Sequence, residues 1–201
     1  MKKITIINCH PNSASLCFGL VEAYRKSAIA AGADVKEIVV ADLKFNVNLA
    51  FGYQKRTEME PELVEAWDKI VWADHLVWVY PVWWGGLPAV AKGFIDRVFL
   101  PGYAFKPREN SVFWDKLLIG KTARIITTLD QPGWFYRLMF GRPSTNQLKK
   151  AVLEYCGVKP VRVTYIGIVK GSTNEAREKW IGKIEKLFRL KKPLSRQRKR
   201  L

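Results

Sequence analysis

Apolar residues in this chain occur either in short continuous runs or at helical spacing. The runs have the length and β-branched content of buried strands, at residues 3–9, 35–40, 76–80, 122–128 and 161–169. The stretches between them predict helices at residues 15–31, 61–72, 88–99, 144–155 and 174–190. Strands that alternate with helices predict an α/β protein with a parallel sheet.

This alternation predicts a three-layer, flavodoxin-like fold with helices on both faces of a five-stranded sheet. Right-handed crossovers and a candidate nucleotide site after the first strand favour the strand order 2-1-3-4-5. Residues 42–60, 101–120 and 129–143 are expected to be loops, the last with a short helix inside. We predict one domain at residues 1–188, followed by a disordered basic tail at residues 189–201.

Composition narrows the classes of partner and site. The net charge is +16, and a basic surface attracts phosphates, nucleic acid or anionic membranes without specifying which. We expect the tail to be solvated, with a tether to an anionic membrane or a nucleic acid as the alternative, and we expect no specific nucleic-acid partner. Three cysteines without C-x-x-C spacing and two histidines argue against a disulfide framework and a metal site. No signal peptide or membrane span is recognisable, so a cytoplasmic protein is expected.

Two loops carry the candidate chemistry. After the third predicted strand, Pro81 is followed by two tryptophans, two glycines and a helix start at Pro88, where open α/β sheets bind flat anionic cofactors. The loop after the first strand, residues 10–17, offers backbone N–H groups, hydroxyls and a helix N-terminus to a phosphate. Alternatively, Ser13 and Ser15 only cap the helix. Neither G-x-G-x-x-G nor the Walker pattern is present, which argues against a NAD-type Rossmann domain and an NTPase.

Together with residues 122–128 (TARIITT), these loops resemble the flavodoxin-like NAD(P)H:quinone oxidoreductases. That family includes DT-diaphorase, modulator of drug activity B and the ancillary reductases of bacterial potassium-efflux channels. Its pattern P-x-x-W-x-G-x-P-A-x-x-K-G-x-x-[DE]-R-V-F is met from Pro81 to Phe99. The resemblance implies bound FMN or FAD, NADPH or NADH as co-substrate, and a homodimer with the active site at its interface. It also implies two-electron, ping-pong hydride transfer to quinones or similar flat acceptors. The alternative is a flavin-binding regulatory subunit of a membrane potassium-efflux system.

The resemblance also assigns cofactor-binding residues. The flavin phosphate is expected at His10, Ser15, Leu16 and Cys17. The flavin ring is expected to contact Pro81, Val82, Trp83, Trp84, Thr127, Thr128 and Leu129. Asp96 and Arg97 are expected to support this site, or simply to pair with charges nearby.

Residues near the substrate follow from the same resemblance. They are Gly85, Trp134, Phe135 and Phe105, the last contributed by the neighbouring subunit. Tyr136 is the candidate catalytic residue, expected near the flavin O2 atom. Two departures leave the substrate open, because Gly85 stands where some relatives carry phenylalanine, and residues 129–132 (LDQP) replace a usual Gly-Gly. A basic chain without a T-x-T-G-x-T loop does not match one-electron flavodoxins.

Overall fold

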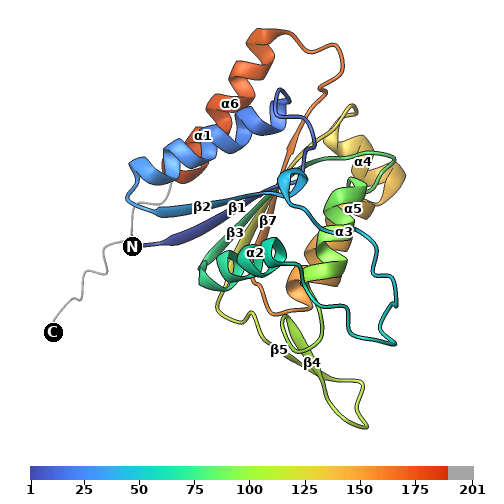
Figure 1. Cartoon of the computed structure of the whole chain (residues 1–201). Coiled ribbons are helices and arrows are strands. Elements are labelled where there is room, and N and C mark those ends of the chain that lie inside the picture. The colour runs from blue at the N-terminus through green and yellow to red at the C-terminus, as the bar shows by residue number, and fades with distance from the viewer. Residues whose placement is uncertain (190–201) are drawn as a thin grey trace, which may run out of the picture.

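A five-stranded parallel sheet forms the centre of the molecule (Figure 1). The computed structural model describes residues 1–189. In spatial order the strands are β2 (Asp34–Val39), β1 (Lys3–Asn8), β3 (His75–Pro81), β6 (Thr122–Thr128) and β7 (Val161–Ile166). When only the strands of this sheet are numbered, the order is 2-1-3-4-5. The predicted parallel sheet and its strand order are therefore confirmed.

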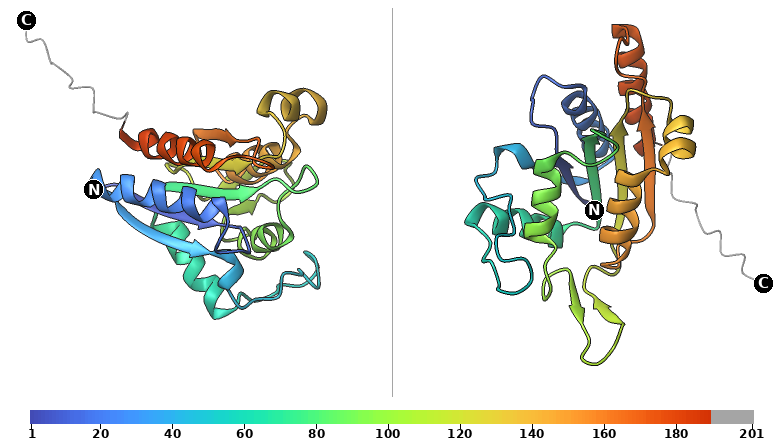
Figure 2. Two further views of the ribbon diagram at one scale, coloured as in Figure 1. Left: turned by 90° about the horizontal axis from the view of Figure 1, so that it is seen from above. Right: turned by 90° about the vertical axis from the view of Figure 1, so that its right-hand side faces the viewer.

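The helices lie on either side of this sheet. They are α1 (Leu16–Ala30), the 3-10 helix η1 (Val40–Asp42), α2 (Pro61–Trp72), α3 (Ala89–Val98), α4 (Gly133–Phe140), α5 (Pro143–Asn146), the π-helix η2 (Gln147–Glu154) and α6 (Asn174–Arg189). Helices α1 and α6 lie together on one side, and α2 and α3 lie on the other (Figures 1 and 2). The predicted short helix within residues 129–143 is α4.

Strand β3 shows why the central strands are apolar throughout. Leu76, Trp78 and Tyr80 pack into the buried cluster beneath α2 and α3. Val77 and Val79 point the other way, into the cluster beneath α1 and α6. Successive strand residues face opposite sides of a sheet, so a strand covered on both sides needs apolar residues at every position.

The expectation of a plain loop at residues 101–120 was wrong. Two antiparallel strands, β4 (Phe105–Pro107) and β5 (Trp114–Lys116), form a hairpin that projects from the body (Figure 2). Trp114 stacks on Tyr155 with ring centroids 4.0 Å apart and donates its indole N–H to the Tyr155 carbonyl oxygen at 2.9 Å. Strands this short carry no readable alternation, and the contact that anchors them is distant in the chain.

Two further boundaries differ from the prediction. Most of the helix expected at residues 144–155 is the π-helix η2. The last strand ends at Ile166 rather than residue 169, because the chain then crosses the loop after β6. A Cβ on Gly167 would lie 2.5 Å from the Leu129 carbonyl oxygen, and the Val169 N–H donates to that same oxygen at 2.9 Å. Close backbone approach at Gly167 therefore ends the strand.

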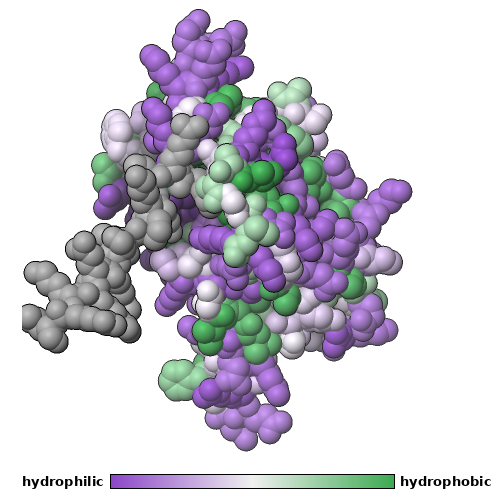
Figure 3. All heavy atoms as spheres, turned by 90° about the vertical axis from the view of Figure 1, so that its left-hand side faces the viewer, coloured by the Kyte–Doolittle hydropathy of each residue, from purple (hydrophilic) through white to green (hydrophobic). Residues whose placement is uncertain are grey.

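The predicted basic tail at residues 189–201 lies outside the described residues, except for Arg189, which ends α6. Within residues 1–189, no helix has both the length and the apolar character needed to cross a membrane. The side from which β1 begins is covered mainly by hydrophilic side chains, with hydrophobic ones between them (Figure 3). The candidate site lies at the other end of the strands.

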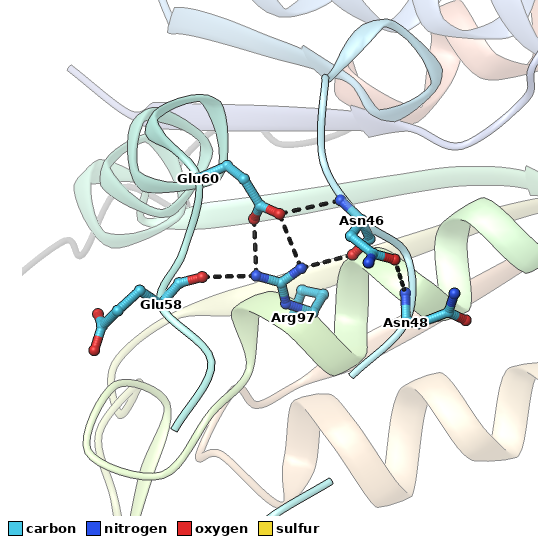
Figure 4. Close-up of polar contacts among 5 residues, drawn as sticks. All are labelled: Asn46, Asn48, Glu58, Glu60 and Arg97. Atoms are coloured by element: carbon cyan, nitrogen blue, oxygen red, sulfur yellow. Dashed lines mark hydrogen bonds and ion pairs between the residues drawn. The ribbon is translucent and has the colours of Figure 1, made fainter. Parts of the chain in front are cut away.

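Helix α3 holds the long excursion at residues 42–60 against the body. At Gly93 a Cβ would lie 2.7 Å from the Val47 Cβ, so only glycine permits this close approach. One turn later the buried Arg97 guanidinium donates to the Asn46 carbonyl at 2.6 Å, the Glu58 carbonyl at 2.7 Å and the Glu60 carboxylate at 2.8 Å (Figure 4). The Gly93 and Arg97 positions of the motif thus have a structural explanation in this chain.

Candidate active site

The loops that follow β1, β3, β6 and β7 meet at the carboxyl edge of the sheet. They enclose a cavity of about 250 Å³. Its lining residues are His10, Ser15, Leu16, Cys17, Pro81, Val82, Trp83, Thr128, Leu129, Asp130 and Val169. The structure therefore brings together all the predicted cofactor-binding residues except Trp84 and Thr127. Parallel strands end at a common edge, so segments far apart in sequence meet there.

The loop between β1 and α1 is organised by its own side chains. The Asn8 side-chain oxygen accepts the His10 N–H at 3.2 Å, and the Asn12 side-chain oxygen accepts the Ala14 N–H at 2.9 Å. The Asn12 N–H donates to the His10 Nδ1 atom at 3.0 Å. These local hydrogen bonds hold the loop in a turn that leads directly into the first turn of α1.

The start of α1 has free hydrogen-bonding capacity. Ser15 occupies the N-cap position but makes no side-chain capping hydrogen bond, so the capping alternative is wrong for this residue. Its buried hydroxyl has no hydrogen-bond partner among the described residues. The first turn contains no acidic side chain. An uncapped helix N-terminus and an unpartnered hydroxyl at one cavity are the groups that an anion such as a phosphate satisfies.

Cys17 contributes a neutral thiol to this cavity. Its sulfur lies 3.8 Å from the Thr128 hydroxyl oxygen. Burial is the main reason that its pKa is raised to about 12, and burial also raises the pKa of Cys9. A thiol with so high a pKa is not a thiolate nucleophile at neutral pH. Cys17 therefore serves as a small packing residue beside the cavity.

A second cavity of about 500 Å³ lies next to the first. Its lining residues are Val82, Trp84, Gly85, Leu129, Asp130, Gln131, Tyr136, Phe140 and Pro143. Val82, Leu129 and Asp130 line both cavities, so the two share a wall. Among the predicted substrate and catalytic residues, Gly85 and Tyr136 line this second cavity.

The other predicted residues lie elsewhere. Thr127 is fully buried within β6, and Trp134 is 65% exposed on α4. Half-buried Phe135 lies on α4 and contacts Trp134 and Phe140, but it lines neither cavity. Phe105 lines a separate cavity beside the β4–β5 hairpin. Within one chain, these four residues therefore line neither of the two adjoining cavities.

Asp96 and Arg97 also lie outside both cavities. Asp96 forms an ion pair with Lys92 at 2.6 Å, and Arg97 pairs with Glu60. This is the arrangement expected if the two residues simply pair with nearby charges. Within residues 1–189, no group of His, Cys, Asp and Glu side chains is placed to hold a metal ion.

The turn between the two cavities has an unusual backbone. Trp83 and Gly86 exchange backbone hydrogen bonds of 3.2 and 2.8 Å, and both central residues have positive φ, 50° at Trp84 and 73° at Gly85. This conformation directs the Trp84 indole into full exposure, whereas Trp83 is 45% exposed and meets the His10 ring edge-on at 5.7 Å. The two tryptophans therefore line different cavities, Trp83 the first and Trp84 the second.

Sequence reasoning missed three residues of this region. Asp130 follows the predicted Leu129 directly, but Val169 arrives only because the chain after β7 crosses that loop. Ser144 is fully buried. Its N–H donates to the Gly85 carbonyl oxygen in the Trp83–Gly86 turn, and its hydroxyl contacts the Tyr136 hydroxyl. Neither Val169 nor Ser144 has a local sequence signal, since each is placed by tertiary contacts.

The family can be identified on this geometry and on comparison with known proteins. A family model described as the flavodoxin-like fold matches residues 2–188. The chain belongs to this family. The family predicted from the sequence motifs is thus confirmed.

Named relatives extend over most of the chain. An uncharacterized NAD(P)H oxidoreductase of Haemophilus influenzae is 28% identical over 181 residues, which cover 88% of this chain and 89% of the relative. FMN-dependent NADH:quinone oxidoreductase 2 of Bacillus cereus is 28% identical over 207 residues, which cover 89% of this chain and 92% of the relative. The crystal structure of Smu.1420 from Streptococcus mutans superposes with a TM-score of 0.82 at 30% identity, covering 94% of this chain and 99% of that one.

His10 gives the cavity a predicted pH dependence. Burial disfavours its charged form and lowers its pKa below the usual value of about 6.5. The folded protein then binds fewer protons than the unfolded chain just below pH 6.5, so stability should fall as the pH drops through the folded pKa. Protonation would also remove the Nδ1 acceptor of the Asn12 N–H. An NMR titration of the His10 ring should give a pKa below 6.5, and a His10 pKa above 6.5 would contradict this expectation.

Proposed function

We propose that this protein is a flavin-dependent NAD(P)H:quinone oxidoreductase. The observation that carries the proposal is the first cavity, where an uncapped helix N-terminus and the unpartnered Ser15 hydroxyl lie beside an aromatic wall at the sheet edge. Of the relatives named above, one is an uncharacterized NAD(P)H oxidoreductase and another is an FMN-dependent NADH:quinone oxidoreductase. The alternative of a regulatory potassium-efflux subunit has no support among these relatives, and it is not proposed.

The residues present fit a flavin phosphate and a flat ring. The α1 N-terminus and Ser15 would bind the phosphate, because within residues 1–189 they offer hydrogen-bond donors that the protein leaves free. Trp83 and the backbone of Val82 and Leu129 would hold the ring, with Trp83 as an aromatic wall. When bound, the flavin supplies the two-electron hydride chemistry, so no protein nucleophile is required.

The protein's own task is to present flat substrates in turn and to exclude water from the reacting face. The second cavity adjoins the first through Val82, Leu129 and Asp130, and it is large enough for a planar ring. We propose that it receives the nicotinamide and then the quinone, which is the order that ping-pong transfer requires. Gly85 leaves room there, and exposed Trp84 offers a flat face.

The proposal includes a cytoplasmic homodimer with the site at its interface. Large apolar side chains are exposed at Trp84, which lines the second cavity, and at Trp134, Leu138 and Met139 on α4, the helix that supplies Tyr136 and Phe140 to that cavity. A second copy would cover this surface and bring further aromatic residues, such as Phe105, to the acceptor. Light scattering on the purified protein tests the dimer, and a monomer at micromolar concentration would remove this part of the proposal.

The function itself is tested by cofactor uptake and turnover. The purified protein is expected to bind FMN or FAD, to lose its yellow colour with NADPH or NADH, and to regain it with menadione. Chromatography of the released cofactor then distinguishes FMN from FAD. A protein that takes up neither flavin would overturn the proposal.

A serine pair in the first loop allows a matched test of the phosphate site. Ser15→Ala is expected to weaken FMN binding about tenfold, because it removes a hydroxyl donor to a charged phosphate. Ser13→Ala is the control, since Ser13 is exposed and lies outside the cavity lining. FMN fluorescence quenching measures both affinities. Equal affinities for the two variants would remove the Ser15 hydroxyl from the site.

A further inference from the structure

The Trp83–Gly86 turn adopts a conformation that its own sequence does not favour. Two-residue turns with positive φ at both central positions prefer Asn-Gly or Gly-Gly, because a bulky side chain is disfavoured at positive φ. Here tryptophan takes the first of these positions, at a φ of 50°. A non-glycine residue persists in such a conformation when surrounding contacts hold it there.

The contacts that hold the turn converge on one carbonyl group. The Gly85 carbonyl oxygen accepts a hydrogen bond from the Tyr136 hydroxyl at 2.9 Å and another from the Ser144 N–H at 3.1 Å. Pro143 also packs on the turn, since a Cβ on Gly85 would lie 3.5 Å from the Pro143 Cγ. The segment from α4 to α5 thus holds the turn by hydrogen bonds and packing on the side of the second cavity.

Tyr136 and Ser144 are themselves locked together. The Ser144 hydroxyl oxygen lies 2.8 Å from the Tyr136 hydroxyl oxygen, which also accepts the Ser144 N–H at 3.1 Å. Tyr136 is 1% exposed and Ser144 fully buried. A phenol has one proton, and the Gly85 carbonyl already accepts it. Burial is the main reason that the pKa of Tyr136 is raised, so the phenol stays protonated at neutral pH.

We propose that Tyr136 and Ser144 are positioning residues whose clamp on Gly85 holds the Trp83–Gly86 turn and sets the place of Trp84 in the acceptor cavity. This inference rests on the proposed function for its catalytic consequence. It assigns the Tyr136 hydroxyl to the protein backbone, in place of the catalytic contact with flavin that the family resemblance implied. Loss of the clamp should therefore act on acceptor binding more than on the hydride step.

The clamp is first tested without any cofactor. Tyr136→Phe is expected to raise hydrogen exchange at the Trp83 and Gly86 amides about fivefold, because the Gly85 carbonyl loses one of the two hydrogen bonds that it accepts. Tyr165→Phe is the matched control. It removes a neighbouring tyrosine hydroxyl that bonds Thr145 at 2.9 Å, and the Tyr165 and Tyr136 rings lie 6.1 Å apart. Equal exchange at these amides in wild type and Tyr136→Phe would overturn the clamp.

A second-site change then separates positioning from proton donation. Glycine adopts positive φ without steric penalty, so Trp84→Gly should keep the turn formed even without the clamp. In the wild-type background, Tyr136→Phe should raise the acceptor KM about fivefold with kcat changed less than twofold. In the Trp84→Gly background, the same change should alter neither amide exchange nor KM further.

A proton-donating Tyr136 would instead lower kcat by the same factor in both backgrounds, and that result would overturn the proposal. The proposed function and the clamp can also be contradicted independently of each other. A protein that binds no flavin would remove the proposed function while the exchange measurement still decides whether the clamp exists. Conversely, unchanged exchange in an active flavoprotein would remove the clamp alone.

Discussion

Replacing Arg97 by methionine should lower the free energy of unfolding by about 3 kcal/mol or more, because several acceptors lose a buried donor and each such loss costs about 1–3 kcal/mol. The guanidinium is 1% exposed and satisfies the Asn46 and Glu58 carbonyls as well as the Glu60 carboxylate (Figure 4). Methionine fills much of the same volume but donates no hydrogen bond. Urea unfolding followed by circular dichroism measures the loss.

Lys92→Met is the matched control on the same helix. Lys92 pairs with Asp96 at 2.6 Å. Both side chains are partly exposed to solvent, Lys92 at 45% and Asp96 at 34%. Surface pairs four residues apart contribute about 0.3–0.5 kcal/mol, so this variant should unfold near wild-type urea concentrations. Equal stabilities of the two variants would contradict a structural role for Arg97.

The pH dependence of the Arg97 variant provides an independent check. Burial raises the pKa of Glu60, but hydrogen bonds from the Asn46 N–H and the Arg97 guanidinium outweigh it, so the pKa is lowered. A carboxyl with a depressed folded pKa contributes stability above its unfolded pKa of about 4.3, and this contribution is lost as the pH falls through the folded pKa. The stability difference between wild type and Arg97→Met should shrink over that acidic window.

Much of the fold follows from local pattern, and the exceptions follow from distant contacts. Strand β3 was predictable because burial on both faces requires an unbroken apolar run. The β4–β5 hairpin was not, because its strands have three residues each and Trp114 is anchored by the distant Tyr155. Gly167 ends β7 only because the Leu129 carbonyl lies against it, which no local pattern reports.

The candidate site divides in the same way. The loops at His10–Cys17 and Pro81–Trp83 were predictable because each directly follows a recognisable strand and the ends of parallel strands converge. Trp84 was placed with Trp83, yet its positive φ turns the indole toward the other cavity. Adjacent tryptophans look equivalent in a sequence. The hydrogen bonds from Tyr136 and Ser144 that separate them exist only in the folded chain.

The division of the tryptophans leads to a second large expected effect. Trp83→Ala should weaken FMN binding about 30-fold, since stacking a flat heteroaromatic ring on an aromatic side chain contributes about 1–3 kcal/mol. Trp83 lines the first cavity and meets His10 edge-on at 5.7 Å, so its loss also opens the phosphate loop. FMN fluorescence quenching measures the affinity.

Trp84→Ala is the matched change one residue along. Its indole is fully exposed and lines only the second of the two cavities, so FMN affinity should stay within about threefold of wild type while the KM for menadione rises about tenfold. Alanine also has a Cβ, so a positive φ is disfavoured at this position in the variant as in the wild type. The hydrogen bonds to Gly85 are therefore needed to hold the turn in both proteins. If both variants lost FMN affinity equally, the two cavities would be one site, and the separation of cofactor and acceptor across Val82, Leu129 and Asp130 would be wrong.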